Sequence, residues 1–310
     1  MFHFIVNPSS QSGKGKTLWN LIERQLKEHH INYKVHFTKY EYHAIKMVQD
    51  ICQEKGEKTI VALGGDGTVS EVVNGITDFD NVKFGYIPTG SSNDFARGLG
   101  LPTRFKKALD CILYSNKTKE IDVGTLDFGN DETQKFGVSC GIGFDGAVCA
   151  EAYSSPIKNF LNRIHMGFLT YTVIAFKNIF TYKVAKLTVT YDDTVTRVYD
   201  QCVMLSALNG PCEGGGLRLA PHANPFDEYL DVFVLNTNNK IKILTFFPLA
   251  YLGIHRALDY FDEVDIVRCK KLHIHSDVPL PVHRDGESCK YRTEMTVSLQ
   301  KKKLKVCVPN

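Results

Sequence analysis

The sequence predicts two domains, an N-terminal α/β domain with a parallel sheet and flanking helices, and a mostly antiparallel β domain after it. The chain has 310 residues, which suits two domains of roughly 100–200 residues each. Apolar strands and helical segments alternate before a polar stretch at residues 127–135, and strand patterns with turns predominate after it. We therefore expect one domain at residues 1–126 and a second at residues 127–310. The last strand of the chain can return to the first domain.

Alternating strands and helices organise the predicted N-terminal domain. Apolar strands are expected at residues 2–6, 33–37, 59–63, 83–87 and 120–126, and helices at residues 17–30 and 42–55. Gly56 is placed to end the second helix. Binding loops of a parallel sheet follow the carboxyl ends of its strands. We therefore expect four loops to converge on one edge: NPSSQSGKGKT, GGDGT, PTGSSND and the residues after Asp122.

The predicted C-terminal domain is rich in β-branched residues with turns between them. Strands are expected at residues 186–191, 197–208, 230–235, 271–276, 295–299 and 303–308. Two helical candidates, at residues 157–180 and 241–260, interrupt this pattern. The first contains basic residues but no acid, and its apolar residues fall on more than one face. This pattern suits either a buried helix pair or a surface that meets lipid, where anionic headgroups attract the basic groups.

Composition and charge exclude several classes of protein. Lys and Arg number 37 against 34 for Asp and Glu, and a net charge of +3 is too small to indicate a nucleic-acid partner. The longest uncharged apolar runs have 13 residues, whereas about 20 are needed to cross a bilayer. The N-terminus lacks the basic region of a signal peptide. The nine cysteines form no CxxC pair, so we expect a soluble, cytoplasmic protein without a sulfur-bound metal.

The motif GGDGT at residues 64–68 follows a buried apolar strand and precedes a helix. Its glycines let the backbone approach a ligand closely, and the backbone N–H groups with the helix N-terminus suit a polyphosphate. Asp66 would repel phosphate directly, but it fits a ligand of Mg²⁺ that bridges to phosphate. The alternative is an ordinary strand–helix turn without a ligand.

The first loop almost matches a second phosphate-binding motif, the Walker A loop. Residues 15–17 read GKT, but Ser10 stands where a Walker A loop needs its first glycine. A Walker A interpretation would make Lys16 the phosphate lysine, and it would leave GGDGT without a role.

The third loop, PTGSSND at residues 88–94, offers hydroxyls and helix caps. Pro and Gly set the turn, and Ser91 and Ser92 contribute hydroxyls. Asn93 or Asp94 is placed to cap the helix that follows. Capping alone would explain both of these last residues.

Six motifs occur in one order along the chain: GGDGTVSEVVNG, PTGSSNDFARGLGLP, IDVG, GIGFDG, NGPCEGGGLRLAPHANPFDEYLDV and RDGE. This ordered set resembles the bacterial diacylglycerol kinase-like lipid kinases, whose catalytic domain is shared with sphingosine and ceramide kinases. NAD kinases share GGDGT, so that motif alone is less specific than the set. The resemblance implies a fold of the NAD kinase and diacylglycerol kinase type, with ATP bound in the cleft between two domains. It also implies Mg²⁺-assisted transfer of phosphate to a lipid hydroxyl, in phospholipid biosynthesis.

The resemblance further implies which residues bind the nucleotide. Ser91 stands where the family usually has Thr, which preserves the hydroxyl, and Gln11 stands where a glycine is usual. The implied nucleotide-site positions are Asn7, Thr38, Gly64, Gly65, Asp66, Gly67, Thr68, Ser91 and Asn93.

In the family that this chain resembles, the acidic pair of the DGE motif supplies the catalytic residue, which here is Asp285 or Glu287. A carboxylate can orient the lipid hydroxyl and accept its proton during transfer. We favour Glu287, with Asp285 as its partner. Without the other motifs, DGE would indicate a hairpin turn. Asp66 and Asp122 complete the candidate catalytic set, Asp122 as a second contact for Mg²⁺.

A separate metal site is also implied by the resemblance. Related lipid kinases hold a structural Mg²⁺ through one carboxylate and two backbone carbonyls, at positions that match Asp227, Asn224 and Tyr229. Oxygen ligands from a short loop suit this ion. Phe226 and Glu228 replace the Asp and Gly of the usual DDGxLD pattern. The alternative is a loop aspartate that caps a turn.

Three functions compete at this point. The first is a kinase that visits the inner membrane surface, makes peripheral contact there and phosphorylates a lipid such as diacylglycerol, with a homodimer as the candidate assembly. The second is an NAD kinase-like phosphotransferase acting on a soluble nucleotide, against which the opening NPSSQSGKGK and the final DGE stand. The third is an inactive nucleotide-binding regulator, against which the presence of Asp66, Asp122, Asp285 and Glu287 argues.

Overall fold

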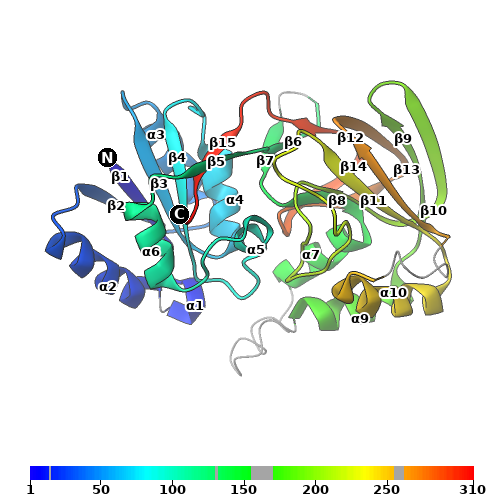
Figure 1. The fold of residues 1–310 in the computed structure, drawn as a ribbon. Coiled ribbons are helices and arrows are strands. Elements are labelled where there is room, and N and C mark those ends of the chain that lie inside the picture. The colour runs from blue at the N-terminus through cyan, green and yellow to red at the C-terminus, as the bar shows by residue number, and fades with distance from the viewer. Residues whose placement is uncertain (14, 130–131, 155–169, 255–261) are drawn as a thin grey trace. The chain divides into compact units, whose positions relative to one another are not determined.

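The computed structural model describes residues 1–13, 15–129, 132–154, 170–254 and 262–310. Contacts divide the chain into unit 1, formed by Met1–Val123 with Lys301–Asn310, and unit 2, formed by Gly124–Gln300. The predicted combination of an α/β part and a mostly antiparallel β part is confirmed (Figure 1). Within the described ranges, no helix is long and apolar enough to span a membrane.

Unit 1 is built on a six-stranded sheet in the order β2-β1-β3-β4-β15-β5 (Figure 1). Neighbouring strands are parallel except for β5, which runs antiparallel to β15. The strands are β1 (Phe2–Val6), β2 (Tyr33–Phe37), β3 (Lys58–Gly64), β4 (Val82–Pro88), β5 (Thr118–Ile121) and β15 (Leu304–Cys307). The helices are α1 (Ser10–Gly13), α2 (Gly15–Glu28), α3 (His43–Cys52), α4 (Asp66–Gly75), α5 (Asp94–Leu99) and α6 (Phe105–Tyr114).

The core of unit 1 follows from the helical spacing seen in the sequence. Trp19, Ile22 and Leu26 lie on one face of α2 and are buried. They share a core with Phe4 of β1 and Leu63 of β3. This packing holds the strands whose carboxyl ends carry the polar loops.

The segment at residues 120–126, predicted as one strand, is divided between two sheets. β5 ends at Ile121 in unit 1, and β6 begins at Gly124 in unit 2. A Cβ at Gly124 would lie 2.0 Å from the ring of Phe136, so the glycine lets that ring pack directly on the backbone of β6. The prediction of a single strand is therefore wrong, because the apolar pattern continues while the chain changes sheets.

Unit 2 is a nine-stranded sheet with antiparallel pairing, in the order β12-β11-β10-β8-β13-β14-β6-β7, and β9 pairs with both β10 and β13. The strands are β6 (Gly124–Asp127), β7 (Thr133–Phe136), β8 (Ser139–Gly143), β9 (Ala185–Tyr191), β10 (Val195–Leu208), β11 (Leu230–Asn236), β12 (Val264–Cys269), β13 (Lys271–Arg284) and β14 (Glu287–Leu299). Its helices include α7 (Phe144–Ser154), α9 (Thr170–Thr181) and α10 (Lys240–Leu252). Parts of the predicted helices at 157–180 and 241–260 lie outside the described residues.

The sheet of unit 2 separates two apolar cores. On β11, Leu230 and Val232 belong to one core and Phe233 to the other, as the alternation of side chains along a strand requires. The second core includes Ile174 of α9 and Phe246 of α10. These helices therefore cover one face of the sheet.

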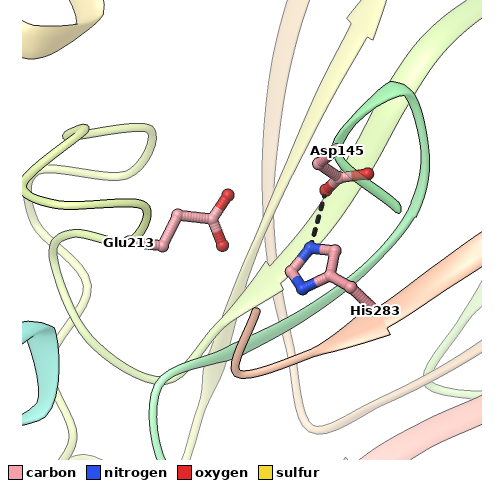
Figure 2. A group of neighbouring side chains, drawn as sticks. All are labelled: Asp145, Glu213 and His283. Atoms are coloured by element: carbon pink, nitrogen blue, oxygen red, sulfur yellow. Dashed lines mark hydrogen bonds and ion pairs between the residues drawn. The ribbon is translucent and has the colours of Figure 1, made fainter. Parts of the chain in front are cut away.

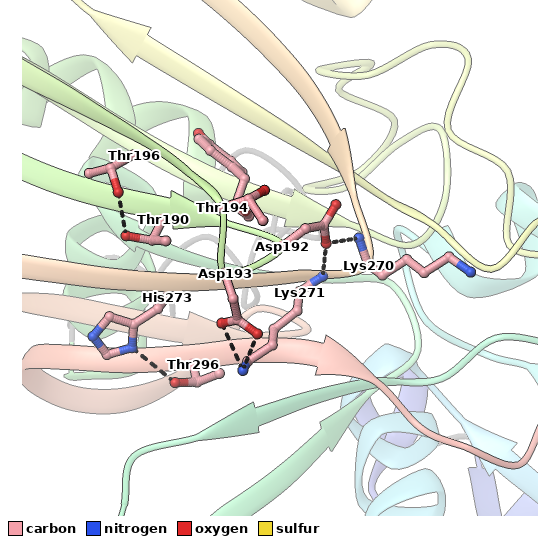
Figure 3. Close-up of polar contacts among 10 residues, drawn as sticks. Thr190, Asp192, Asp193, Thr194, Thr196, Lys270, Lys271, His273 and Thr296 are labelled. Carbon is pink, nitrogen blue, oxygen red and sulfur yellow. Dashed lines mark hydrogen bonds and ion pairs between the residues drawn. The ribbon is translucent and has the colours of Figure 1, made fainter.

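A polar cluster holds the turn between β9 and β10 (Figure 3). Asp192 and Asp193 have φ angles of 48° and 57°, in the left-handed region that Asp tolerates better than most residues. Asp192 Oδ1 accepts hydrogen bonds from the backbone N–H groups of Lys270 and Lys271, at 2.8 and 3.0 Å. Asp193 forms an ion pair with Lys271 Nζ at 2.9 Å. These contacts attach the tip of this hairpin to the start of β13.

A stacked histidine pair lies at the start of the sheet in unit 1. The rings of His3 and His36 are 5.6 Å apart and nearly parallel. Burial lowers the pKa of His3 to about 4, although Glu54 at 3.7 Å acts in the opposite direction. Burial also lowers the pKa of His36, and Lys34 adds to this effect.

We expect this pair to make the protein sensitive to acid. The contribution of His3 to stability is complete above pH 6.5 and is lost as the pH falls toward about 4, because the unfolded chain then binds a proton that folded His3 resists. The loss should be on the order of 2–3 kcal/mol. His3→Gln should make the melting temperature less dependent on pH between 7 and 4. His275→Gln, at an exposed position, should leave this dependence unchanged. An unchanged slope in His3→Gln would count against this explanation.

Candidate functional site

Two glycine loops of unit 1 lie against each other at the carboxyl edge of the parallel strands. β3 ends at Gly64, and Gly65 is the N-cap of α4. After β4, the N–H of Thr89 donates to the carbonyl of Gly64 at 2.8 Å. A Cβ on Gly90 would lie 2.8 Å from the Cα of Gly65. The loops approach this closely because glycine stands at the point of contact.

Asn7 and Thr38 join the same edge. The N–H of Asn7 donates to the carbonyl of Leu63 at 3.0 Å, and Asn7 Nδ2 donates to Thr68 Oγ1 at 3.3 Å. Thr38 follows β2, and its N–H donates to the carbonyl of Val6 at 2.9 Å. The structure thus brings the ends of β1, β2 and β3 together, as the predicted parallel order requires.

Asn93 shapes the third loop instead of capping α5. Its φ angle of 51° is left-handed, and its side chain makes no capping hydrogen bond to α5. Its Oδ1 accepts from the hydroxyl of Tyr86 at 3.1 Å and from the N–H of Gly90 at 3.0 Å. Its Nδ2 donates to the carbonyl of Gly90 at 2.8 Å. Ser91 is exposed at the surface of this closed loop.

Asp66 links the two glycine loops. It is the first residue of α4, and its Oδ1 accepts from the N–H of Phe95 at 3.4 Å, in the first turn of α5. Asp66 thus accepts a backbone N–H at the start of α5, where the sequence predicted a cap from Asn93 or Asp94. A carboxylate next to two helix N-termini is stabilised by their positive ends.

Asp122 does not lie beside these loops. β5 runs antiparallel to β15, and β15 is parallel to β4, so the end of β5 is level with the start of β4. Asp122, the next residue, is therefore at the sheet edge opposite Gly64. It is buried, with its Oδ1 3.2 Å from Lys303 Nζ. The expectation that the residues after Asp122 converge with the glycine loops is wrong, because the alternating pattern does not reveal this strand's direction.

In unit 2 the DGE motif forms the turn between β13 and β14. Asp285 and Gly286 have φ angles of 48° and 83°, which suit a two-residue hairpin turn. The Asp285 carboxylate accepts from the three backbone N–H groups of residues 137–139, at 2.9 to 3.2 Å. Glu287 begins β14, and its Oε2 is 3.8 Å from Arg284. The two acids thus have different surroundings. Asp285 binds the backbone of residues 137–139, whereas Glu287 lies at the start of β14.

The loop at residues 224–231 does not fit a structural Mg²⁺. Asp227 Oδ2 is 2.6 Å from the guanidinium of Arg268, and Asp227 Oδ1 accepts the N–H of Tyr229 at 3.1 Å. Glu228 takes the left-handed φ angle of 65° that a glycine would adopt with less strain. An arginine cation thus already compensates the carboxylate charge, and the side-chain oxygen of Asn224 accepts the N–H of Phe226. The arrangement matches an aspartate that caps a turn.

Sequence analysis missed a buried cluster in unit 2, formed by Asp145, Glu213 and His283 (Figure 2). His283 Nε2 is 2.9 Å from Asp145 Oδ2. Burial by itself would lower the pKa of His283, but the Asp145 carboxylate outweighs burial and raises this pKa to about 9. The three residues are 68 and 70 positions apart, and only the motifs GIGFDG, NGPCEGGG and RDGE around them signalled their neighbourhood.

Comparison with known proteins covers both units. Residues 1–126 match the diacylglycerol kinase catalytic domain, and residues 142–308 match the YegS C-terminal NAD kinase beta sandwich-like domain. The chain is 29% identical to YtlR of Bacillus subtilis over 293 residues, 92% of each chain. It is 30% identical to a diacylglycerol kinase of Mycobacterium tuberculosis over 236 residues, 75% of this chain and 71% of the relative. A solved structure from Bacillus anthracis superposes with a TM-score of 0.76 at 25% identity, covering 99% of this chain and 95% of that one.

Proposed function

The chain belongs to the diacylglycerol kinase family and is a lipid kinase, and we propose that it transfers the γ-phosphate of ATP to the hydroxyl of a lipid such as diacylglycerol. The convergence of the two glycine loops with Asn7 carries this proposal. Backbone N–H groups at the start of α4 and close glycine contacts are what a polyphosphate requires. Asn7, Thr38, Ser91 and Asn93 complete the proposed nucleotide site around Gly64–Thr68.

The residues at this edge fit a hard cation. Asp66 offers a carboxylate at the start of α4, and Asn7 and Thr68, which are hydrogen-bonded to each other, add side-chain oxygens at the same edge of the sheet. Mg²⁺ prefers such oxygen ligands and retained water, and when bound it neutralises charge on the transferring phosphate. We assign Asp66 as the residue that holds this ion, directly or through water.

Glu287 is our candidate for the group that accepts the proton of the lipid hydroxyl. A hydroxyl is a weak nucleophile, and a carboxylate within hydrogen-bond reach orients it and takes its proton as the P–O bond forms. Asp285 is less suited to this task, because its oxygens already accept the N–H groups of residues 137–139. Its role in this proposal is to hold the turn that presents Glu287.

Two helices of unit 2 are proposed to contact the membrane. α9 buries Ile174 but exposes Phe176 and Phe180, which are 55% and 59% exposed. α10 packs against α9 and exposes Ile241 and Leu252, at 68% and 65%. The helices are thus apolar on both faces, and their charged residues are all lysines. The buried face joins the core, and the exposed apolar face suits a lipid surface, whereas Lys177 and Lys242 already pair with Glu151 and Glu263.

The double variant Phe176→Ser/Phe180→Ser tests this surface. We expect its binding to anionic phospholipid vesicles to fall about tenfold or more, because two exposed aromatic side chains no longer enter the lipid. Sedimentation with vesicles measures this directly. Tyr114→Ser, which removes an exposed aromatic residue of unit 1, is the matched control. Equal vesicle binding by all three proteins would exclude α9 as the contact.

The function itself is tested by radiolabelled ATP turnover with Mg²⁺, against diacylglycerol, sphingosine, ceramide and NAD in parallel. Label in an organic-phase product is the expected result, and the product names the lipid. Label only in NADP would favour an NAD kinase-like phosphotransferase. Bound ATP without any labelled product would favour a nucleotide-binding regulator.

A further inference from the structure

The cluster of Asp145, Glu213 and His283 contains none of the residues assigned to phosphate transfer above, although His283 lies two residues before Asp285. Asp145 lies in the first turn of α7, Glu213 in the loop after β10, and His283 near the end of β13. One ligand-type atom of each residue lies within 4.8 Å of the others. The side chains of His283 and Asp145 are only 3% and 11% exposed, and Glu213 is buried. Three distant segments therefore bring charged groups to one interior point (Figure 2).

The orientation of Asp145 leaves one oxygen to face this point. Its Oδ1 accepts the N–H of Gly146 at 2.7 Å, whereas its Oδ2 faces His283. Ser206 Oγ donates to the same Oδ2 at 2.6 Å and lies 3.3 Å from Glu213 Oε1. A hydroxyl carries one hydrogen, so Ser206 can serve only one of the two carboxylates at a time.

The backbone of β8 leaves room for these atoms at Gly141. A Cβ there would lie 2.1 Å from Asp145 Oδ2 and 2.6 Å from His283 Nε2. Any other residue at position 141 would thus occupy the space in which the carboxylate and the imidazole meet. The glycine makes a cradle at the centre of the cluster.

We propose that Asp145, Glu213 and His283 form a binding site for one transition-metal dication, with Zn²⁺ as the best match. Binding of the dication would displace the proton of His283, and the two carboxylates and the neutral imidazole would then balance its charge. Ligand atoms of a tetrahedral zinc site are roughly 3–4 Å apart, so small side-chain movements complete the site. Imidazole favours Zn²⁺ over Mg²⁺. The ion would connect α7 and the loop after β10 to β13. Its ligand on β13, His283, lies two residues before Asp285.

The test is a titration of the chelator-treated full-length protein with ZnCl₂ alone, by calorimetry and thermal unfolding, without ATP or lipid. We expect one equivalent to bind and the melting temperature to rise. Glu213→Gln and His283→Gln should each weaken binding by about 100-fold or more, because a ligand is removed. His273→Gln is the matched control, since His273 pairs with Glu294 on the exposed part of β13.

Two results would overturn the proposal. One is the absence of stoichiometric uptake by the unmodified protein, which would show that the His283–Asp145 ion pair alone explains the cluster. The other is equal Zn²⁺ affinity in Glu213→Gln and the unmodified protein. Glu213→Gln keeps the His283–Asp145 pair, so it decides the matter even if His283→Gln does not fold. Because neither ATP nor lipid is present, failure here is distinct from failure of the proposed kinase activity.

Discussion

Glu287→Gln is expected to lower kcat by about 10²–10⁴-fold, the contribution typical of a general base. The substitution keeps the size of the side chain but removes the proton acceptor. Affinity for ATP should stay near that of the unmodified protein, because glutamine keeps the shape of the side chain and can still accept a hydrogen bond from Arg284, which is 3.8 Å from the Glu287 carboxylate. Steady-state kinetics with the best lipid of the panel, together with ATP binding, measure both effects.

Asp285→Asn separates the second acid from the first. An asparagine has one acceptor oxygen, so it cannot reproduce the hydrogen bonds that the Asp285 carboxylate accepts from residues 137–139. We expect a loss of about 1–3 kcal/mol in the free energy of unfolding, with lower activity as a consequence. Loss of kcat in Asp285→Asn at an unchanged melting temperature, with Glu287→Gln still active, would reverse the assignment of the base.

Asp66→Asn is expected to lower kcat/KM by about 10²–10³-fold and to raise the Mg²⁺ concentration needed for half-maximal activity at least roughly tenfold. The reason is that an amide binds Mg²⁺ far less well than a carboxylate. The long contact of Asp66 with the N–H of Phe95, at 3.4 Å, can persist through the amide oxygen. The measurement is turnover as a function of Mg²⁺ at saturating ATP.

Asp80→Asn is the matched control for Asp66→Asn. Asp80 is an exposed aspartate of unit 1 that pairs with Lys302 at the surface. Exposed pairs contribute little to stability, so turnover and its Mg²⁺ dependence should be unchanged. If Asp66→Asn showed the same Mg²⁺ dependence as this control, Asp66 would not be a ligand of the ion.

The position of the glycine loops could be predicted because its signals are local. GGDGT follows an apolar strand directly, and the parallel order of β1, β3 and β4 brings strand ends to one edge. The direction of β5 could not be predicted in this way. It pairs with β15, which lies more than 180 residues later in the chain. An apolar strand pattern does not encode the direction of its partner, and this is why Asp122 was misplaced.

The sequence by itself determined the fold class, the two glycine loops and the place of the DGE motif, because periodicity, glycine positions and turn residues act over a few neighbouring residues. Only the tertiary structure decided how each acid is used. Asp285 binds the backbone of residues 137–139, Asp227 pairs with Arg268, and Asp145 meets His283. The partners of a carboxylate are the donors and cations around it, and folding brings these from distant parts of the chain.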